Sequence, residues 1–261
     1  MAQWLERFRF YRHPPDEAAI RAWLGRFKEE HQPIAMRVLD AVVVIPEVEI
    51  QQGYKDALDS LPGWSRDKAH RQGRWYFVGF GGAGESGVAM LRTFREANNL
   101  TNSMWDPLFC MPRDLPKLRL SAYDRVVFVD DFSGSGKQVC SYWPLMQELV
   151  ASEATCYLVL TAATAAALGE IQRKTELQLR TRITLPEAAN IFSEESNLFG
   201  ADEKAVLVEY GGIAWRAHPK GFGGCGLLFV LSHKTPNNSI PILYVNHQAW
   251  VGLFPRNLLA A

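Results

Sequence analysis

Between residues 75 and 185, short apolar segments alternate with segments of helical periodicity, and this alternation restricts the fold more than any other feature. The apolar segments are typical of buried strands and lie at 75–78, 125–129, 156–161 and 177–185. The segments between them predict helices at about 86–97, 138–150 and 163–174. Strands that alternate with helices favour right-handed crossovers. We therefore predict an α/β fold with a mainly parallel sheet and helices on both faces.

The segments on either side of this alternation lead us to divide the chain into three parts. Residues 1–65 show helical patterns throughout and predict an N-terminal helical lobe, residues 66–185 form the predicted α/β core, and residues 186–261 are a C-terminal cap that completes the core. Within the flanks we expect helices that begin near Asp16 and helices at about 33–44, 47–60 and 202–216, and a strand at about 226–231.

The composition narrows the class of protein. The 261 residues are 48% hydrophobic, and 28 basic residues balance 28 acidic ones. Zero net charge argues against a strongly basic nucleic-acid binder, although a local basic patch remains compatible with it. No apolar run reaches the 18 or so residues of a membrane span, and the first residues lack the apolar core of a secretion signal.

The cysteines and histidines carry no metal-binding pattern. The four cysteines form no C-x-x-C pair, and the six histidines form no H-E-x-x-H motif. We expect reduced thiols in a cytoplasmic protein that is not bound to a membrane, and no metal cage made by the protein alone.

The most informative segment runs from Val126 to Gln138. Four apolar residues make a buried strand, Asp130 and Asp131 follow at its carboxyl end, and a Gly/Ser loop leads into a helix. Such a loop can direct backbone N–H groups at a phosphate, and the start of a helix adds partial positive charge. Two adjacent carboxylates would repel a bare anion, so they make sense if they hold sugar hydroxyls or a hydrated Mg²⁺.

A P-loop is the obvious rival, because the segment ends in Gly136-Lys137. The motif G-x-x-x-x-G-K-[ST] needs glycine at position 131 and Ser or Thr at position 138. The chain has Asp131 and Gln138 there, and an acidic residue would oppose the triphosphate. We therefore set the P-loop aside.

The segment resembles the ribose-phosphate signature of type I phosphoribosyltransferases, which joins a hydrophobic strand, two acidic residues and a Ser/Thr/Gly-rich loop. The resemblance implies a glycosyltransferase that acts at ribose C1 of phosphoribosyl pyrophosphate (PRPP) with Mg²⁺. Asp130 and Asp131 would be the catalytic pair that holds the ribose hydroxyls, and they are also the predicted metal ligands. The implied 5′-phosphate cradle is Ser133, Gly134, Ser135, Gly136 and Lys137.

The glycine-rich segment 79–87 lies between a strand and a helix, where the same family has its pyrophosphate loop. The resemblance implies that Gly81, Gly82, Glu85 and Ser86 bind the leaving group. Two alternatives stay open at this point. The segment also matches G-x-G-x-x-G, the dinucleotide fingerprint of NAD(P)-dependent oxidoreductases, with Asp106 as the candidate ribose carboxylate. It is also compatible with a purely structural turn.

Two departures from the family pattern motivate a second hypothesis. The family loop often closes with Thr, where the chain has Gln138, and purine-salvage members often carry an acidic residue where it has Gly134. A catalytically inactive sensor of PRPP or of a nucleotide is therefore the alternative to an enzyme. Residues 100–119 lie where the family has its mobile catalytic loop, so Arg113, Lys117 and Arg119 are either lid residues or an ordinary surface loop.

The C-terminal run from His233 to Pro241 resembles the tail of phosphoribosyltransferase-like proteins of bacterial conflict and antiphage systems, including those linked to retrons. Its asparagines could read a nucleobase, on which Phe222 and Trp250 could stack, or the run is a turn without a ligand. The resemblance implies an antiviral effector with a protein or nucleoprotein partner. The acceptor of the phosphoribosyl group and homo-oligomerisation stay open.

Overall fold

The computed structural model describes residues 1–82, 86–150 and 153–256, and its contacts divide the chain into two compact units. The first combines residues 1–47 with 186–261, and we call it the split unit. The second comprises residues 48–185, and we call it the sheet unit. The sheet unit therefore begins before the boundary at residue 65 that the sequence suggested, because the second half of the helix at 47–59 packs on the sheet.

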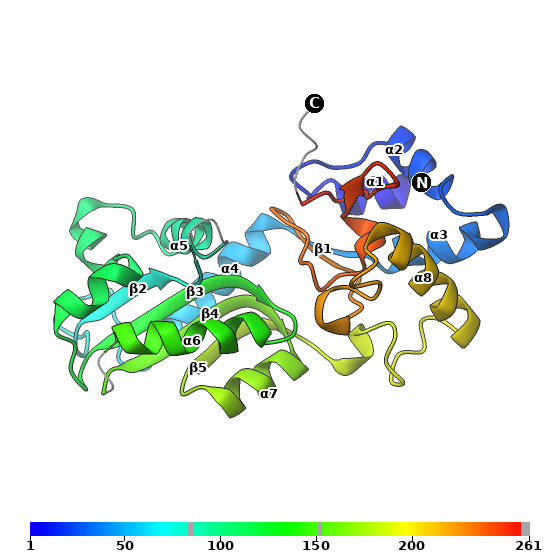
Figure 1. Ribbon diagram of the computed structural model, residues 1–261. Coiled ribbons are helices and arrows are strands. Elements are labelled where there is room, and N and C mark those ends of the chain that lie inside the picture. Colours follow the sequence, from blue (N-terminus) through cyan, green and yellow to red (C-terminus); the bar gives the residue numbers. More distant parts are fainter. Residues whose placement is uncertain (83–85, 151–152, 257–261) are drawn as a thin grey trace. The chain divides into compact units, whose positions relative to one another are not determined.

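The sheet unit contains a four-stranded parallel sheet in the order β2-β3-β4-β5 (Figure 1). Its strands are β2 (Trp75–Gly79), β3 (Arg125–Ser133), β4 (Thr155–Thr164) and β5 (Gln178–Leu185). β2, β3 and β4 are buried along nearly their whole length, which explains why each reads as a continuous apolar run.

Helices cover both faces of this sheet, as the sequence predicts. The helices are α4 (Glu47–Asp59), α5 (Ser86–Ala97), α6 (Lys137–Leu149) and α7 (Ala165–Lys174). On one face Phe77 packs against Phe94 of α5, which also contacts Tyr54 of α4. On the other face Phe128 contacts Trp143 of α6, in a cluster that also includes Ile171 of α7. The predicted fold class is confirmed.

After β2 the chain first adds a segment on one side of this strand and then adds β3 on the other side. After β2 and α5 the chain returns through the 3₁₀ helix η2 (Ser103–Leu108), and Phe109 makes a parallel bridge to Phe77 on the edge of β2 opposite β3. It then passes through the 3₁₀ helix η3 (Pro112–Leu118) and enters β3 on the other edge. In open α/β sheets, ligands bind outside the carboxyl ends of the strands at such a switch point. Here that point lies between β2 and β3.

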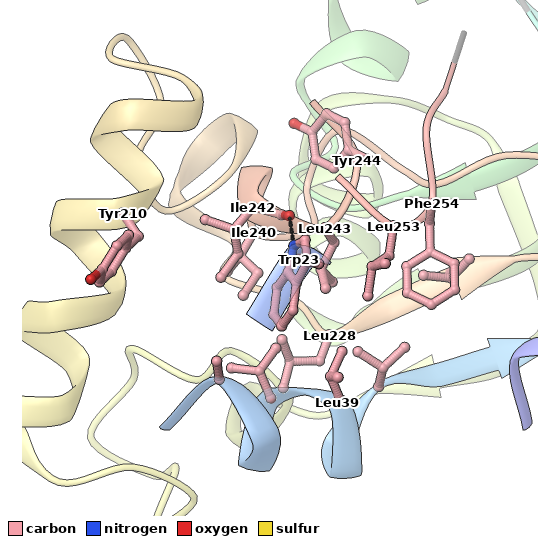
Figure 2. Close-up of a cluster of buried hydrophobic side chains, with 14 of the residues drawn as sticks. Trp23, Leu39, Tyr210, Leu228, Ile240, Ile242, Leu243, Tyr244, Leu253 and Phe254 are labelled. Atoms are coloured by element: carbon pink, nitrogen blue, oxygen red, sulfur yellow. Dashed lines mark hydrogen bonds between the residues drawn. The ribbon is translucent and has the colours of Figure 1, made fainter. Parts of the chain in front are cut away.

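The split unit has its own core, to which both ends of the chain contribute. Trp23 donates its indole N–H to the Ile242 carbonyl at 2.9 Å, and Leu39, Leu228 and Phe254 pack in the same cluster (Figure 2). Its main helices are α1 (Ala2–Phe8), α2 (Glu17–Leu24), α3 (Gln32–Ala41) and α8 (Ala201–Ala214). Its shorter elements are η1 (Glu29–His31), η4 (Glu187–Ala189), η5 (Phe222–Gly224), η6 (Pro241–Leu243), β7 (Asn246–His247) and β8 (Trp250–Val251).

One element contradicts the prediction that residues 1–65 are helical throughout. Val43–Ile45 form strand β1, which pairs in parallel with β6 (Phe229–Leu231). The helix expected to reach residue 44 ends at Ala41, because the residues from Val43 onward form backbone hydrogen bonds with β6, which lies far along the chain. Local periodicity cannot detect a pairing of this kind.

Among the described residues, no helix combines the length and the apolar character that a bilayer crossing requires. All four cysteines are free thiols.

Candidate functional site

Two buried carboxylates and one hydroxyl meet at the carboxyl ends of β2 and β3. Asp130 and Asp131, in β3, are only 4% and 7% exposed. Ser86, the first residue of α5, donates its hydroxyl to Asp130 Oδ1 at 2.7 Å, and its Oγ lies 3.1 Å from Asp131 Oδ1. The structure therefore brings together predicted residues from both loops.

The charged form of Asp130 is electrostatically unfavourable at this position. Burial, and then the neighbouring charge of Asp131, raise the pKa of Asp130 well above its ordinary value. The Ser86 hydroxyl and the Asp131 backbone N–H, which donates to Asp130 Oδ1 at 2.9 Å, offset only part of this effect. A bound cation, or a ligand that donates hydroxyl groups, would stabilise the ionised pair.

Tyr54 is a residue of this site that the sequence analysis missed. It lies on α4, and its fully buried hydroxyl donates to the Asp130 backbone carbonyl at 2.9 Å. Burial, followed by the charge of Asp131, raises the pKa of Tyr54 well above its ordinary value, so the phenol stays a neutral donor. In the sequence Tyr54 lies on the same apolar helix face as Ile50 and Leu58, and nothing there marks its hydroxyl as different.

The loop that follows the acidic pair is fixed to the neighbouring helix. Thr164 donates its hydroxyl to the Gly134 carbonyl at 2.6 Å, and the same oxygen accepts the Ala167 N–H at the start of α7. Gly136 has φ 69° and precedes α6, and a Cβ there would lie 3.1 Å from the Ala167 carbonyl oxygen. The chain thus turns sharply into the amino end of α6, whose first-turn N–H groups border the loop.

The predicted phosphate cradle differs in exposure along its length. Ser133, Gly134 and Gly136 are buried, Ser135 is half-buried, and Lys137 is exposed as the first residue of α6. An anion at this loop would meet backbone N–H groups and the partial positive charge of the helix start, with the exposed ammonium group of Lys137 beside them.

The first loop follows β2 and reaches the same edge of the sheet. The Phe80 N–H donates to the Val129 carbonyl at 2.9 Å, and Gly81 and Gly82 come next in half-buried positions. A Cβ on Gly87 would lie 1.9 Å from the Phe80 carbonyl oxygen, so α5 approaches this loop as closely as only glycine permits. The predicted residue Glu85 lies outside the described residues.

The lid interpretation of residues 100–119 is not supported at Arg119. The Arg119 carbonyl accepts a hydrogen bond from Arg74, which directly precedes β2. Arg119 therefore lies at the amino end of the sheet, and the five residues of β2 separate the two ends by about 16 Å. Lys117, two residues earlier, pairs with Asp114 at 2.9 Å.

Side chains predicted to read a nucleobase are engaged inside the split unit. Trp250 is 2% exposed and donates its indole N–H to the Ile242 carbonyl. Asn238 is buried, and its amide donates to the Phe222 carbonyl. These contacts agree with the alternative of a turn without a ligand.

Asp106, the carboxylate that a dinucleotide site would need, pairs with Arg95.

The donor set at the acidic pair is suitable for Mg²⁺. Mg²⁺ prefers oxygen ligands and is often bound by one or two carboxylates together with substrate oxygens and water. Asp130, Asp131 and Ser86 provide oxygen atoms only, and a divalent cation would offset the repulsion that raises the pKa of Asp130. Among residues 1–82, 86–150 and 153–256, no group of three or more His, Cys, Asp or Glu side chains forms a metal cage. A cation at the pair would therefore need ligand oxygens to complete its shell.

Comparison with known proteins gives one family. A family model described as PRTase-CE, a phosphoribosyltransferase-like family, matches residues 20–256, which is nearly the whole chain. A search of curated proteins finds no match. The family match includes both loops of the site, and it removes the support for a dinucleotide-dependent oxidoreductase.

Proposed function

The chain belongs to the PRTase-CE family, and we propose that it binds PRPP with Mg²⁺ at the carboxyl ends of β2 and β3 and acts at ribose C1. The observation that carries this proposal is the meeting of Asp130, Asp131 and Ser86 at the switch point of the sheet. Burying two neighbouring carboxylates costs free energy unless a cation or hydrogen-bond donors compensate their charge. A ribose offers two adjacent hydroxyl donors to such a pair.

The two loops bind different parts of PRPP. In this proposal Asp130 and Asp131 accept hydrogen bonds from the ribose hydroxyls, and backbone N–H groups of residues 133–137 hold the 5′-phosphate at the start of α6. Lys137 adds a positive charge. Backbone N–H groups at Gly81 and Gly82 bind the pyrophosphate, which Mg²⁺ would neutralise in part when it is bound.

The chemistry proposed is substitution at C1. The bond from C1 to the pyrophosphate oxygen breaks, and its electron pair leaves with the pyrophosphate. A nucleophilic atom of the acceptor then forms the new bond to C1 and loses its proton to solvent or to a base on the acceptor side. Positive charge develops on the ribose, and the carboxylates of Asp130 and Asp131 stabilise it. Most of the rate enhancement comes from positioning.

A sensor that binds PRPP without turnover is the second candidate. The observation in its favour is Gly134, which takes the place where purine-salvage members often carry an acidic residue. Gly134 is buried, and its carbonyl accepts a hydrogen bond from Thr164. This position therefore has a structural contact and provides no side chain that could act as a base.

Ligand-induced stabilisation tests the binding proposal. We expect PRPP with Mg²⁺ to raise the melting temperature, whereas ribose 5-phosphate has a smaller effect and ATP and NAD have none. The variant Asp130→Asn/Asp131→Asn should lose the shift. The matched variant Asp59→Asn/Asp202→Asn, which changes two exposed aspartates, should keep it. A shift of equal size in the first variant contradicts the site.

Pyrophosphate release separates the two candidates. With PRPP, Mg²⁺ and a panel of nucleobases, nucleosides and oligonucleotides, an enzyme releases pyrophosphate in proportion to time and protein. A sensor shows the thermal shift and no release above the level of the Asp130→Asn/Asp131→Asn variant.

The role in antiphage defence, with a protein or nucleoprotein partner, is a separate proposal that rests on the resemblance of the C-terminal run. A plaque assay with phage, comparing the parent gene with the gene for Asp130→Asn/Asp131→Asn, tests it. Protection that depends on the acidic pair is expected, and equal plaque counts with both genes contradict the effector role.

A further inference from the structure

Positive charge is concentrated at the end of the sheet opposite the proposed active site. Segments 64–74 and 111–125 contain eight basic and three acidic residues, although the 28 basic and 28 acidic residues of the whole chain balance. We call the surface formed by these basic residues the basic face. Its members are Arg66, Lys68, Arg71, Arg74, Arg113, Lys117, Arg119 and Arg125.

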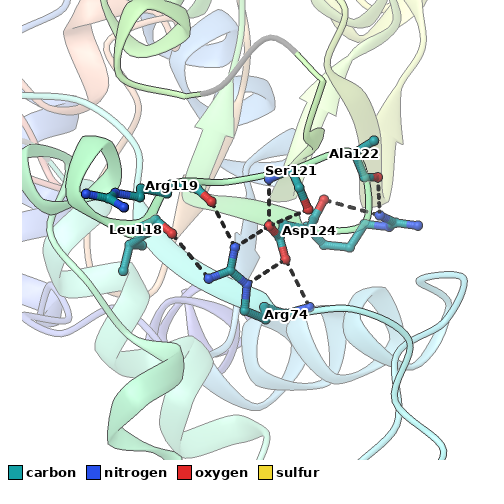
Figure 3. Close-up of polar contacts among 7 residues, drawn as sticks. Arg74, Leu118, Arg119, Ser121, Ala122 and Asp124 are labelled. Carbon is teal, nitrogen blue, oxygen red and sulfur yellow. Dashed lines mark hydrogen bonds and ion pairs between the residues drawn. The ribbon is translucent and has the colours of Figure 1, made fainter.

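The two segments are joined at the amino ends of β2 and β3. The Arg74 guanidinium donates to the carboxylate of Asp124 and to the carbonyls of Leu118 and Arg119 (Figure 3). The Arg125 N–H donates to the Arg74 carbonyl. This network fixes Arg119 in the left-handed region at φ 47°, which a non-glycine residue adopts only when its surroundings require it. The Arg119 side chain is turned away from Asp124 and is exposed.

The acidic residues of the two segments are engaged locally. Asp124 is buried against Arg74 and Ser121, Asp114 pairs with Lys117, and Asp67 pairs with His70. Within the part of the chain that the structure describes, only two of the eight cations form an ion pair, Arg74 with Asp124 and Lys117 with Asp114. The six others form no ion pair with a carboxylate there, and they include Arg66, Lys68, Arg119 and Arg125. The basic face therefore carries uncompensated positive charge.

Aromatic rings lie among these cations. Tyr123 is 80% exposed at the turn between Arg119 and Arg125, with no apolar core to hold it. On the other segment the Arg71 guanidinium lies over the rings of Trp64 and Trp105, at 4.6 and 5.1 Å from their centroids. Cations that follow a phosphate backbone, together with an exposed ring on which a base can stack, are the features of single-strand binding surfaces.

We infer that the basic face binds single-stranded nucleic acid, with Arg66, Lys68, Arg119 and Arg125 on the phosphates and Tyr123 stacked on a base. This binding site is distinct from the proposed PRPP site, because it occupies the opposite end of the sheet. It does not require that PRPP is the substrate, so either proposal can fail while the other holds. A duplex fits less well, because its paired bases are not free to stack on Tyr123.

Fluorescence anisotropy with a labelled 20-nucleotide oligothymidylate tests the proposal in the full-length protein. We expect saturable binding that weakens as the salt concentration rises. The logarithm of the association constant should fall against the logarithm of the salt concentration with a slope of about −3, which four phosphate contacts on a single strand would give. The variant Lys68→Glu/Arg119→Glu should bind at least tenfold more weakly and flatten the slope by roughly 1.4. The control Lys55→Glu/Arg216→Glu has the same net charge, changes exposed side chains outside the two segments and should bind like the parent.

Two further comparisons make the test specific. Tyr123→Ala should weaken single-strand binding by about tenfold and leave the melting temperature unchanged, since the ring is exposed. A DNA duplex of equal length should bind more weakly than the single strand. Equal losses in both charge-reversal variants, or tighter binding of the duplex, overturn the proposal. So does binding to phosphatidylserine vesicles without binding to the oligonucleotide.

Discussion

Asp124 directly precedes β3, Asp130 lies toward its carboxyl end, and both are buried. Asp124 accepts hydrogen bonds from Arg74 and Ser121, and the Arg74 bonds are the main cause that lowers its pKa from 3.8 to about 2. Asp130 is next to a second carboxylate, and its pKa is raised by burial and by Asp131. The charged form of the carboxylate is therefore favoured just before the amino end of the strand and disfavoured toward its carboxyl end.

The difference indicates what each end of the sheet does. At the amino end the protein itself provides the cation, so the buried charge stabilises the fold. At the carboxyl end the Ser86 hydroxyl and the Asp131 backbone N–H offset only part of the effect that raises the pKa of Asp130, as expected for a carboxylate whose charged form a ligand would stabilise. Proteins commonly give up some stability at functional sites in this way.

The removal of Arg74 tests the amino end of the sheet. Arg74→Met leaves Asp124 buried without its cation, and we expect a loss of about 2 kcal/mol of unfolding free energy at pH 7. Because the folded-state pKa of Asp124 is lowered, its contribution is present above its unfolded pKa near 4 and is lost as pH falls toward about 2. Urea unfolding of both proteins from pH 7 to pH 2 should show the difference shrink. A loss that does not depend on pH contradicts the ion-pair explanation. Arg92→Met, on an exposed pair, serves as the control and should change little.

A glycine substitution tests the close packing at the carboxyl end. In Gly87→Ala the new Cβ would lie 1.9 Å from the Phe80 carbonyl oxygen, so the loop or α5 must shift, at a cost of about 1–3 kcal/mol. The matched change Gly169→Ala, in α7, meets nothing within 4 Å and should stabilise by up to about 1 kcal/mol. Thermal unfolding measures both. Similar behaviour of the two variants would show that the approach of α5 to this loop is not close.

The two ends should respond with opposite sign to the same substitution. Asp131→Asn removes a repulsive charge and should stabilise the protein without ligand by about 1 kcal/mol at pH 7, whereas Asp124→Asn should destabilise it. The raised pKa of Asp130 means that stability is greatest below the unfolded pKa and falls as pH rises toward the folded one. Asp131→Asn should reduce that fall. Destabilisation by both substitutions contradicts the comparison.

The smallest effect concerns Tyr54. Tyr54→Phe removes the hydrogen bond to the Asp130 carbonyl and should lower the unfolding free energy by about 1 kcal/mol. If the bond also positions the acidic pair, PRPP affinity should fall several-fold. Tyr123→Phe removes an exposed hydroxyl and should alter neither quantity. Calorimetry of both variants measures stability and affinity together, and an unchanged affinity in Tyr54→Phe rules out the positioning role.

The sequence predicted the parts of the fold that local patterns encode. The strand at Val126–Val129, the acidic pair after it and the helix from Lys137 are contiguous in the chain, so their order and spacing could be read directly. Ser86 lies beside the acidic pair because parallel strands bring their carboxyl ends to one edge of the sheet. The fold class followed from the same alternation.

What the sequence missed depends on contacts between distant residues. Strand β1 exists only because Phe229–Leu231 lies beside it, and Tyr54 reaches Asp130 only after α4 packs on the sheet. For Arg119 the sequence leaves a lid and an ordinary surface loop open, because its position between Pro116 and β3 does not reveal that its carbonyl accepts a hydrogen bond from Arg74 at the amino end of the sheet. Trp250 looked available for stacking, whereas two terminal segments bury it in one core.

The most direct test of the central claim is isothermal titration calorimetry of PRPP with Mg²⁺ into the parent protein and into Asp130→Asn/Asp131→Asn. We predict one saturable site in the parent and no measurable heat in the variant, whose melting temperature without ligand should be equal to or above that of the parent. PRPP binding of equal affinity in both proteins would contradict the claim that the carboxyl end of the sheet, with its unfavourable acidic pair, is the site where the ligand binds.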